Sequence, residues 1–163
     1  MNIDIAIIVG SRNDLSFMQK GLGLYKSLNI AFEVKILSAH RTPELLKEYM
    51  ESAEKNGCRL YIAGAGMAAH LPGVIASQTL KPVIGVPFNA SSLNGIDSLL
   101  SIAMMPPGIP VSCMGIGSSG FYNACLFALQ VLSLGNPSLS KLLADQRKQK
   151  ELEIIKDNET LEY

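Results

Sequence analysis

Five short apolar runs, separated by segments with helical spacing, constrain the fold of this chain more than any other feature. The runs cover Ile3–Val9, Phe32–Leu37, Leu60–Ala63, Pro82–Val86 and Val111–Ile116. When strands alternate with helices, the strands run parallel, because each connection returns through a helix that covers one face of the sheet. The pattern therefore predicts an α/β fold with a central parallel sheet and helices on both faces.

The first two helical segments carry clear local signals. Five residues of the first segment follow the spacing of one buried helical face: Leu15, Met18, Leu22, Tyr25 and Leu28. Gly21 and Gly23 weaken this helix by about 1 kcal/mol each relative to alanine, unless a close contact requires them. Thr42 is the expected N-cap of the second helix, and Pro43 fits its first position, where a missing N–H costs nothing.

Composition sets the size and the class of the molecule. The chain has 163 residues, 48% of them hydrophobic, and is expected to form one domain over residues 1–163. Its formal net charge of zero argues against a nucleic-acid partner. Charged residues make up 17%, below the roughly 25% of a typical soluble domain. Because large apolar patches are uncommon on monomers, we expect a homo-oligomer.

Cysteine usage and hydropathy favour the cytoplasm. Cys58, Cys113 and Cys125 have neither metal-ligand spacing nor an even count, so they are expected to be buried thiols in a reducing compartment. No apolar run approaches the ~18 residues that span a bilayer. Residues 1–9 are unlike a signal peptide because Asp4 interrupts their apolar run. We expect a soluble protein with no membrane partner.

Two segments outside the regular alternation are expected to make contacts. Residues 89–110 are irregular around one helix, Leu93–Ala103, and can serve as a covering loop or an interface. Residues 138–163 form a C-terminal helix and tail whose charges are most simply a solvated face. Its apolar residues are expected to pack on a neighbouring subunit: Leu142, Leu143, Leu152, Ile154 and Ile155.

Polar residues follow the first three predicted strands, at the edge where parallel sheets bind ligands. After the first strand, Ser11 can hold an anion at a helix N-terminus and Asp14 can accept hydrogen bonds from a ribose diol. The alternative is structural: Ser11 caps the helix, and Asp14 complements its dipole. After the second strand, Arg41 carries a planar fork suited to phosphate or carboxylate, or else forms a surface ion pair.

The glycine-rich loop after the third strand does not fit the common nucleotide motifs. Residues Gly64–Ala69 spell G-x-G-x-x-A, but no acidic residue follows near Ile84, where a dinucleotide fingerprint expects one. A P-loop motif is absent from the sequence. Instead of a nucleotide motif, the small residues of this loop indicate that the backbone closely approaches a flat ligand.

The chain has two histidines, His40 and His70, and each follows a predicted strand. Histidine exchanges protons near neutral pH, so both are candidates for acid/base catalysis; ordinary surface or core imidazoles are the alternative. Two histidines thirty positions apart, with no third ligand nearby, make a poor zinc site. The residues therefore favour acid/base catalysis by histidine on a phosphorylated small molecule.

Four linked motifs resemble one enzyme family over about Ile3 to Leu134. They are Gly10-Ser11 with Asp14, the run Ser38–Pro43, Gly64-Ala65-Gly66 with the run Ala68–Gly73, and Asp97–Ile102 followed by Met105-Pro106. Together they resemble the bacterial 5-(carboxyamino)imidazole ribonucleotide mutases of purine biosynthesis, the class I branch of the phosphoribosylaminoimidazole carboxylase catalytic subunits. The resemblance implies a flavodoxin-like three-layer α/β/α sandwich, assembled as an octamer with sites shared between subunits.

The same resemblance implies roles for individual residues. Ser11, Asp14 and Arg41 would bind the ribose phosphate, and His40 would be the general acid/base. His70, the second catalytic candidate, would lie in the loop around the imidazole and the migrating carboxylate, as a wall and hydrogen-bond partner. The remaining substrate-binding candidates are Ser38, Gly66, Met67, Ala68 and Leu71.

The implied reaction moves a carboxylate from the exocyclic nitrogen to ring carbon 4 of the aminoimidazole ribonucleotide. Carbon dioxide would be lost with proton assistance, trapped beside the ring and attacked by carbon 4, and one histidine could serve both proton steps. Small and apolar residues around the imidazole would keep water out. The family uses no metal, biotin, flavin or nucleotide cofactor.

Three positions depart from the family pattern. Asn13 stands where serine is usual, Met67 replaces a common glycine and could narrow the pocket, and Met104 occupies a position that usually holds glutamine. Two other functions stay open. One is the direct carboxylation of aminoimidazole ribonucleotide with carbon dioxide. The related carboxylases that catalyse it lack the His-Leu-Pro run that this chain has at 70–72. The other is a non-catalytic nucleotide or flavin carrier, because one fold serves many functions.

Overall fold

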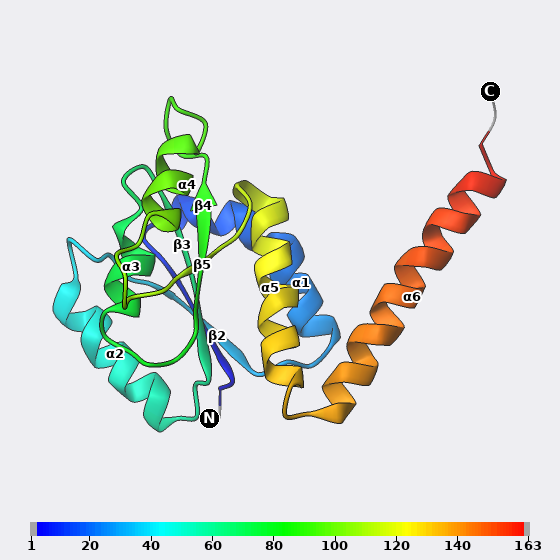
Figure 1. The fold of residues 1–163 in the computed structure, drawn as a ribbon, viewed down its shortest axis with the longest axis horizontal. Coiled ribbons are helices and arrows are strands. Elements are labelled where there is room, and N and C mark those ends of the chain that lie inside the picture. The colour runs from blue at the N-terminus through cyan, green and yellow to red at the C-terminus, as the bar shows by residue number, and fades with distance from the viewer. Residues whose placement is uncertain (1–2, 162–163) are drawn as a thin grey trace. The chain divides into compact units, whose positions relative to one another are not determined.

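The computed structural model describes residues 3–161, and a five-stranded parallel sheet lies at its centre (Figure 1). The strands are β1 (Ile5–Val9), β2 (Phe32–Ile36), β3 (Leu60–Gly66), β4 (Val83–Phe88) and β5 (Ser112–Cys113), in the order β2-β1-β3-β4-β5. Every adjacent pair is parallel; Ile5, for example, pairs with Phe32 on one side and Leu60 on the other. The predicted parallel sheet is confirmed.

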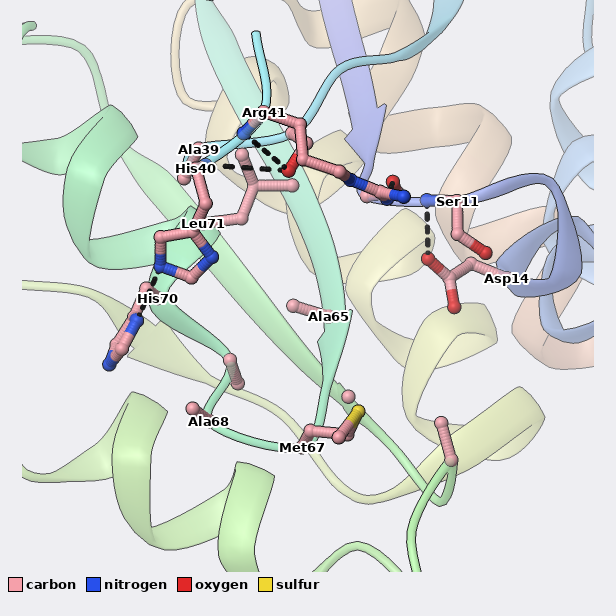
Figure 2. Close-up of a pocket in the computed structure, with 15 residues that line it drawn as sticks. Ser11, Asp14, Ala39, His40, Arg41, Ala65, Met67, Ala68, His70 and Leu71 are labelled. Atoms are coloured by element: carbon pink, nitrogen blue, oxygen red, sulfur yellow. Dashed lines mark hydrogen bonds between the residues drawn. The ribbon is translucent and has the colours of Figure 1, made fainter. Parts of the chain in front are cut away.

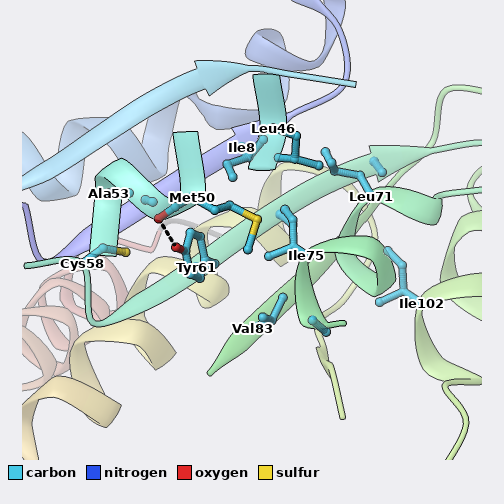
Figure 3. Close-up of a cluster of buried hydrophobic side chains, with 14 of the residues drawn as sticks. Ile8, Leu46, Met50, Ala53, Cys58, Tyr61, Leu71, Ile75, Val83 and Ile102 are labelled. Atoms are coloured by element: carbon cyan, nitrogen blue, oxygen red, sulfur yellow. Dashed lines mark hydrogen bonds between the residues drawn. The ribbon is translucent and has the colours of Figure 1, made fainter. Parts of the chain in front are cut away.

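The helices are η1 (Arg12–Met18), α1 (Gln19–Ser27), α2 (Pro43–Lys55), α3 (His70–Ala76), α4 (Ile96–Ala103), α5 (Gly117–Ser133) and α6 (Pro137–Glu159). Side chains of α2, α3 and α4 form one buried cluster with strand residues such as Ile8 and Tyr61 (Figure 3). Within this cluster the Tyr61 hydroxyl donates to the carbonyl oxygen of Met50 at 3.3 Å. These three helices therefore form one outer layer.

Helix α1 and the first part of α5 form the other outer layer (Figure 1). The Tyr25 hydroxyl donates to the carbonyl oxygen of Cys125 at 3.0 Å, and the Tyr25 ring lies against Phe32 of β2. The Phe17 ring stacks on Phe88 of β4, with 4.6 Å between ring centroids. The layers and the strand order are those of the flavodoxin-like fold, as expected.

The start of the first helix differs from its prediction. Residues Arg12–Met18 form a 3-10 helix, which has three residues per turn, so a 3.6-residue spacing counted from Leu15 goes out of phase. Met18, Leu24 and Tyr25 are buried, whereas Leu15, Leu22 and Leu28 are half-buried. The buried face of α1 therefore includes Leu24, which the predicted spacing left out.

Several strand bounds also shift. Strand β3 extends past the predicted Ala63 because Ala65 and Gly66 pair with Pro87 and Phe88 of β4. Strand β5 is limited to two residues, since only Ser112 and Cys113 pair with β4. The predicted run Val111–Ile116 is longer than β5, so its other apolar residues do not pair with β4.

The chain divides into two compact units, the first ending at Ala128 and the second beginning at Leu129. In the second unit, α6 begins at Asn136, whose side chain accepts a hydrogen bond from the backbone N–H of Leu139 at 3.3 Å. No residue of α6 is buried. The single domain over residues 1–163 and the contact of residues 138–163 with a neighbouring subunit stay predictions, and residues 162–163 lie outside the described part. Among residues 3–161, no helix has both the length and the apolar character for a bilayer crossing.

Candidate active site

An open pocket of about 480 Å³ lies where the chain leaves β1, β2 and β3 (Figure 2). All ten residues singled out from the sequence line it: Ser11, Asp14, Ser38, His40, Arg41, Gly66, Met67, Ala68, His70 and Leu71. The parallel sheet explains this convergence, because the carboxyl ends of its strands meet at one edge. Five further residues line it that were not named as site residues: Gly10, Ala39, Ala65, Ala69 and Ala90.

Four of these five belong to the predicted loops and directly flank predicted site residues. Ala90 differs, because it follows β4 and comes from a fourth loop. Its position as another parallel-strand exit is the signal that could have found it. A Cβ added to Gly66 would lie 2.6 Å from the Cβ of Ala90, so the two loops touch and glycine is required there.

Ser11 and Asp14 bind each other's backbone at the start of η1. The Ser11 hydroxyl accepts a hydrogen bond from the N–H of Asn13 at 3.0 Å, and the Asp14 carboxylate accepts from the N–H of Ser11 at 2.9 Å. The structural alternative, in which Ser11 caps this helix, is therefore observed. It does not exclude a ligand, because the Ser11 hydroxyl keeps its own proton as a donor.

Asp14 is nearly buried, with 7% of its surface exposed. Burial raises the pKa of this carboxyl; the backbone N–H groups of Ser11 and Gly10 and the charge of Arg41 act in the opposite direction but do not cancel it. An ionised carboxylate in this place is costly for the fold. This cost is typical of a group that serves a ligand.

The loop after β2 is held by its own hydroxyl groups. The Ser38 hydroxyl accepts hydrogen bonds from the N–H groups of His40 and Arg41, at 3.3 and 3.2 Å. Thr42 stands at the N-cap of α2 as predicted, but its hydroxyl does not cap the helix. Instead it accepts from the N–H of Ser38 at 2.9 Å and donates to the Ser38 carbonyl at 3.1 Å.

Arg41 joins the first two loops. One guanidinium nitrogen, Nη2, donates to the carbonyl oxygen of Gly10 at 2.9 Å. Among residues 3–161, Arg41 forms none of the ion pairs found, and the partner of Nη2 is a neutral carbonyl. The guanidinium keeps further N–H donors for an anion at this end of the pocket.

The two histidines lie next to each other on one side of the pocket (Figure 2). Nε2 of His40 lies 2.7 Å from Nδ1 of His70, and the rings stand nearly perpendicular, at 89°, with centroids 4.9 Å apart. One of these nitrogens must carry the shared proton and the other must accept it. Sequence reasoning brought both residues to the site, but their separation of thirty positions gave no sign of a direct hydrogen bond.

The loop after β3 forms the apolar end of the pocket. A tight turn closes it, in which the N–H of Ala69 donates to the carbonyl oxygen of Gly66 at 3.0 Å. Met67 and Ala69 both have left-handed backbone conformations, with φ of 56° and 43°. The pocket thus has a polar end at the first loop, a histidine pair, and an apolar end at the third.

Two of the three departures from the family pattern leave the pocket intact. Asn13 contributes its backbone N–H to the cap of Ser11, which a serine would supply equally. Met104 ends α4 and does not line the pocket. Met67 does line it. Among the described residues, no group of three or more His, Cys, Asp and Glu side chains could hold a metal ion.

Comparison with known proteins identifies the family. The profile of the AIR carboxylase family matches residues 4–153. The chain belongs to this family. AIR carboxylase relatives that are named N5-carboxyaminoimidazole ribonucleotide mutase include one from Escherichia coli K12, 46% identical over 94% of this chain and 90% of its own length. A second, from Pyrococcus abyssi, is 50% identical over 88% of this chain and 81% of its own length. A third, from Bacillus subtilis, is 43% identical over 96% of this chain and 97% of its own length.

A solved structure has the same fold. The crystal structure of Treponema denticola PurE superposes with a TM-score of 0.86, covers 98% of each chain and is 26% identical in sequence. The resemblance seen in the sequence motifs is thereby confirmed at the level of family and fold.

Proposed function

We propose that this protein is an N5-carboxyaminoimidazole ribonucleotide mutase, an isomerase of purine biosynthesis. One observation carries the proposal: a single pocket joins an anion-binding end, a pair of hydrogen-bonded histidines and an apolar end. The three relatives named above, which carry this name, support the same reaction. The substrate would be a small ribonucleotide with a carboxylate on its exocyclic nitrogen.

The polar end of the pocket sets the orientation of this substrate. Arg41 and the hydroxyl groups of Ser11 and Ser38 offer donors to the phosphate, and Asp14 accepts hydrogen bonds from the ribose hydroxyls. The phosphate would lie near the Arg41–Gly10 hydrogen bond. The aminoimidazole ring would then extend toward the histidines and Leu71.

His40 is the proton carrier in the proposed mechanism. It donates a proton to the exocyclic nitrogen as the bond from this nitrogen to the carboxylate carbon breaks, which releases carbon dioxide. Carbon 4 of the ring then attacks the carbon dioxide and forms the new bond. The neutral His40 removes the proton from carbon 4, which restores the aromatic ring and the enzyme.

The apolar end of the pocket suits the intermediate. Carbon dioxide carries no net charge and needs no strong hydrogen-bond donor, so the small side chains of Ala65, Ala68 and Ala90 can surround it. Exclusion of water protects it from hydration to bicarbonate. The reaction is an isomerisation that balances without a redox step, so it requires no redox cofactor, and the family resemblance implies no metal or nucleotide either.

Assembly and location follow from the same proposal. We infer a homo-oligomer, an octamer by the family resemblance, in the cytoplasm, where purine precursors are made. Its partners would be the ribonucleotide and transient carbon dioxide, without nucleic acid or membrane. The low fraction of charged residues, 17%, supports association between copies.

An assay of the purified protein tests the reaction. Conversion of N5-carboxyaminoimidazole ribonucleotide without added bicarbonate supports the mutase. Strict dependence on bicarbonate, with aminoimidazole ribonucleotide as the substrate, would instead identify a direct carboxylase. A yellow chromophore that copurifies with a protein inactive on both ribonucleotides would identify a flavin carrier.

A further inference from the structure

Thr42 stands at the N-cap of α2, but its hydroxyl group serves the preceding loop. A hydroxyl at this position usually accepts a hydrogen bond from a backbone N–H in the first turn of the helix. The Thr42 hydroxyl instead accepts from the N–H of Ser38 at 2.9 Å and donates to the Ser38 carbonyl at 3.1 Å. It therefore holds both backbone polar groups of Ser38 and leaves α2 without a side-chain cap.

Ser38 transmits this restraint to the two functional residues that follow it. Its hydroxyl accepts from the N–H groups of His40 and Arg41, at 3.3 and 3.2 Å. Its carbonyl accepts from the N–H of Thr42 as well, at 3.0 Å. Residues 38–42 thus form a closed network of hydrogen bonds, in which the Thr42 hydroxyl joins the end of the loop to its beginning.

Packing contributes little to the placement of His40 and Arg41, because both residues are exposed. Each nevertheless makes one precise contact. His40 points to His70, with 2.7 Å between Nε2 and Nδ1, and Arg41 points toward the loop of Ser11, where Nη2 lies 2.9 Å from the carbonyl oxygen of Gly10 (Figure 2). Both contacts depend on the backbone of the loop, which the network fixes.

We propose that Thr42 is a positioning residue for the carboxylate transfer. This inference rests on the proposed mutase function. Thr42 itself does not line the pocket. By restraining Ser38, its hydroxyl fixes the loop from which His40 reaches the ring and Arg41 reaches the phosphate. Loss of this hydroxyl therefore disturbs proton transfer and substrate binding together, although neither group is removed.

Steady-state kinetics of three variants test this role. Thr42→Val keeps the branched shape of threonine without the hydroxyl, and Thr42→Ala also lacks the hydroxyl. We expect both to lower kcat by about 10–100-fold, because a misplacement of about 1 Å at a catalytic site can cost about 10²-fold in rate. Both should also raise KM several-fold, since Arg41 shares the loop. Thr42→Ser, which keeps the hydroxyl, should stay close to the wild type.

A second measurement reports on the loop without any substrate. The chain has two histidines, so solid-state ¹⁵N NMR of histidine-labelled protein, free of a histidine tag, observes this pair alone. We expect the signals of the paired nitrogens, Nε2 of His40 and Nδ1 of His70, to shift in Thr42→Val and Thr42→Ala toward those of a solvated imidazole. In Thr42→Ser they should keep their wild-type positions.

Thr79 provides a matched control in the loop before β4, at the opposite end of the strand from the pocket. Its hydroxyl also accepts a backbone N–H, that of Lys81 at 3.1 Å, and donates to an acceptor, the carboxylate of Glu54. Thr79→Val therefore removes the same kinds of hydrogen bond. It should keep the wild-type kcat, KM and histidine signals, with circular dichroism confirming that each variant is folded.

Wild-type kinetics and histidine signals in Thr42→Val and Thr42→Ala would overturn the proposal. Equal losses in Thr42→Ser or in Thr79→Val would do so too, because the effect would then not come from the Thr42 hydroxyl. If the wild type does not convert the substrate, the mutase assignment itself fails, whereas the NMR comparison still shows whether Thr42 positions the histidine pair. The two failures are therefore distinguishable.

Discussion

The hydrogen bond between His40 and His70 determines which ring nitrogens can meet a ligand. Because Nε2 of His40 and Nδ1 of His70 face each other at 2.7 Å, the nitrogens left for other partners are Nδ1 of His40 and Nε2 of His70. If the shared proton belongs to His40, its Nδ1 has a lone pair and acts as a base. If His40 carries a proton on both nitrogens, it acts as an acid through Nδ1 and becomes neutral, with the Nε2 proton still shared with His70. Loss and recovery of the Nδ1 proton would thus let His40 serve both steps.

Replacement of His40 by asparagine tests this role. We expect His40→Asn to lower kcat by about 10²–10⁴-fold, the usual contribution of a general acid or base. Affinity for the product ribonucleotide should stay close to the wild-type value, because the proposed phosphate and ribose contacts lie at the other end of the pocket. Steady-state kinetics and titration calorimetry measure the two quantities. A kcat near that of the wild type would remove His40 from the mechanism.

Asp14, the proposed ribose ligand, is also expected to affect stability. Burial raises its pKa, so the folded state holds the proton of this carboxyl more tightly than the unfolded chain does. Its contribution therefore favours folding at acid pH and is lost as the pH rises through the raised pKa. Asp14→Asn keeps an oxygen that can accept from the N–H of Ser11 but carries no charge.

We therefore expect Asp14→Asn to be at least as stable as the wild type at neutral pH, with a difference that shrinks as the pH falls. Its affinity for the ribonucleotide should decrease. Thermal melts across acid to neutral pH and a binding titration measure both effects. A variant that is less stable than the wild type at neutral pH would contradict this interpretation of Asp14.

At the scale of elements, two glycines of α1 allow a matched comparison. A Cβ added to Gly21 would lie 2.7 Å from the Sγ of Cys125 and from ring carbons of Phe121, whereas one added to Gly23 meets nothing within 4 Å. Gly21 thus has the close contact that would justify it, and Gly23 has none. We expect Gly23→Ala to raise the free energy of unfolding by about 1 kcal/mol through helix propensity.

Gly21→Ala should instead lower it by about 1–3 kcal/mol, because the added methyl group overpacks the contact between α1 and α5. Chemical denaturation of both variants measures the difference. Similar effects of the two substitutions would show that the contact at Gly21 adjusts without cost.

The elements that the sequence predicts well are those whose signal is local. Alternating apolar runs and helices determine the parallel sheet, and the strand exits bring Ser11, His40 and His70 to one edge. Contacts between residues that are far apart in the sequence are harder to predict. The β3 extension depends on pairing with β4, and Ala90 reaches the pocket because its loop touches Gly66. The hydrogen bond between the histidines depends on how two loops approach each other, which no spacing along the chain encodes.

At the scale of the whole molecule, α6 is an element that carries exposed apolar side chains. None of its 23 residues is buried, and Leu152 and Ile155 are 48% and 46% exposed. They lie three positions apart, on one side of the helix. Exposed apolar residues at helical spacing are typical of interfaces between subunits.

We therefore expect a double variant, Leu152→Glu with Ile155→Glu, to weaken the oligomer, because two carboxylates would have to be buried without partners. Sedimentation velocity should show a smaller assembly than the wild type at the same concentration, with unchanged helical content by circular dichroism. The matched control, Gln149→Glu with Asn158→Glu, adds the same two charges to α6 at exposed polar positions and should assemble normally. If the double variant sediments like the wild type, Leu152 and Ile155 do not form the interface, and a wild type that sediments as a monomer would refute the assembly itself.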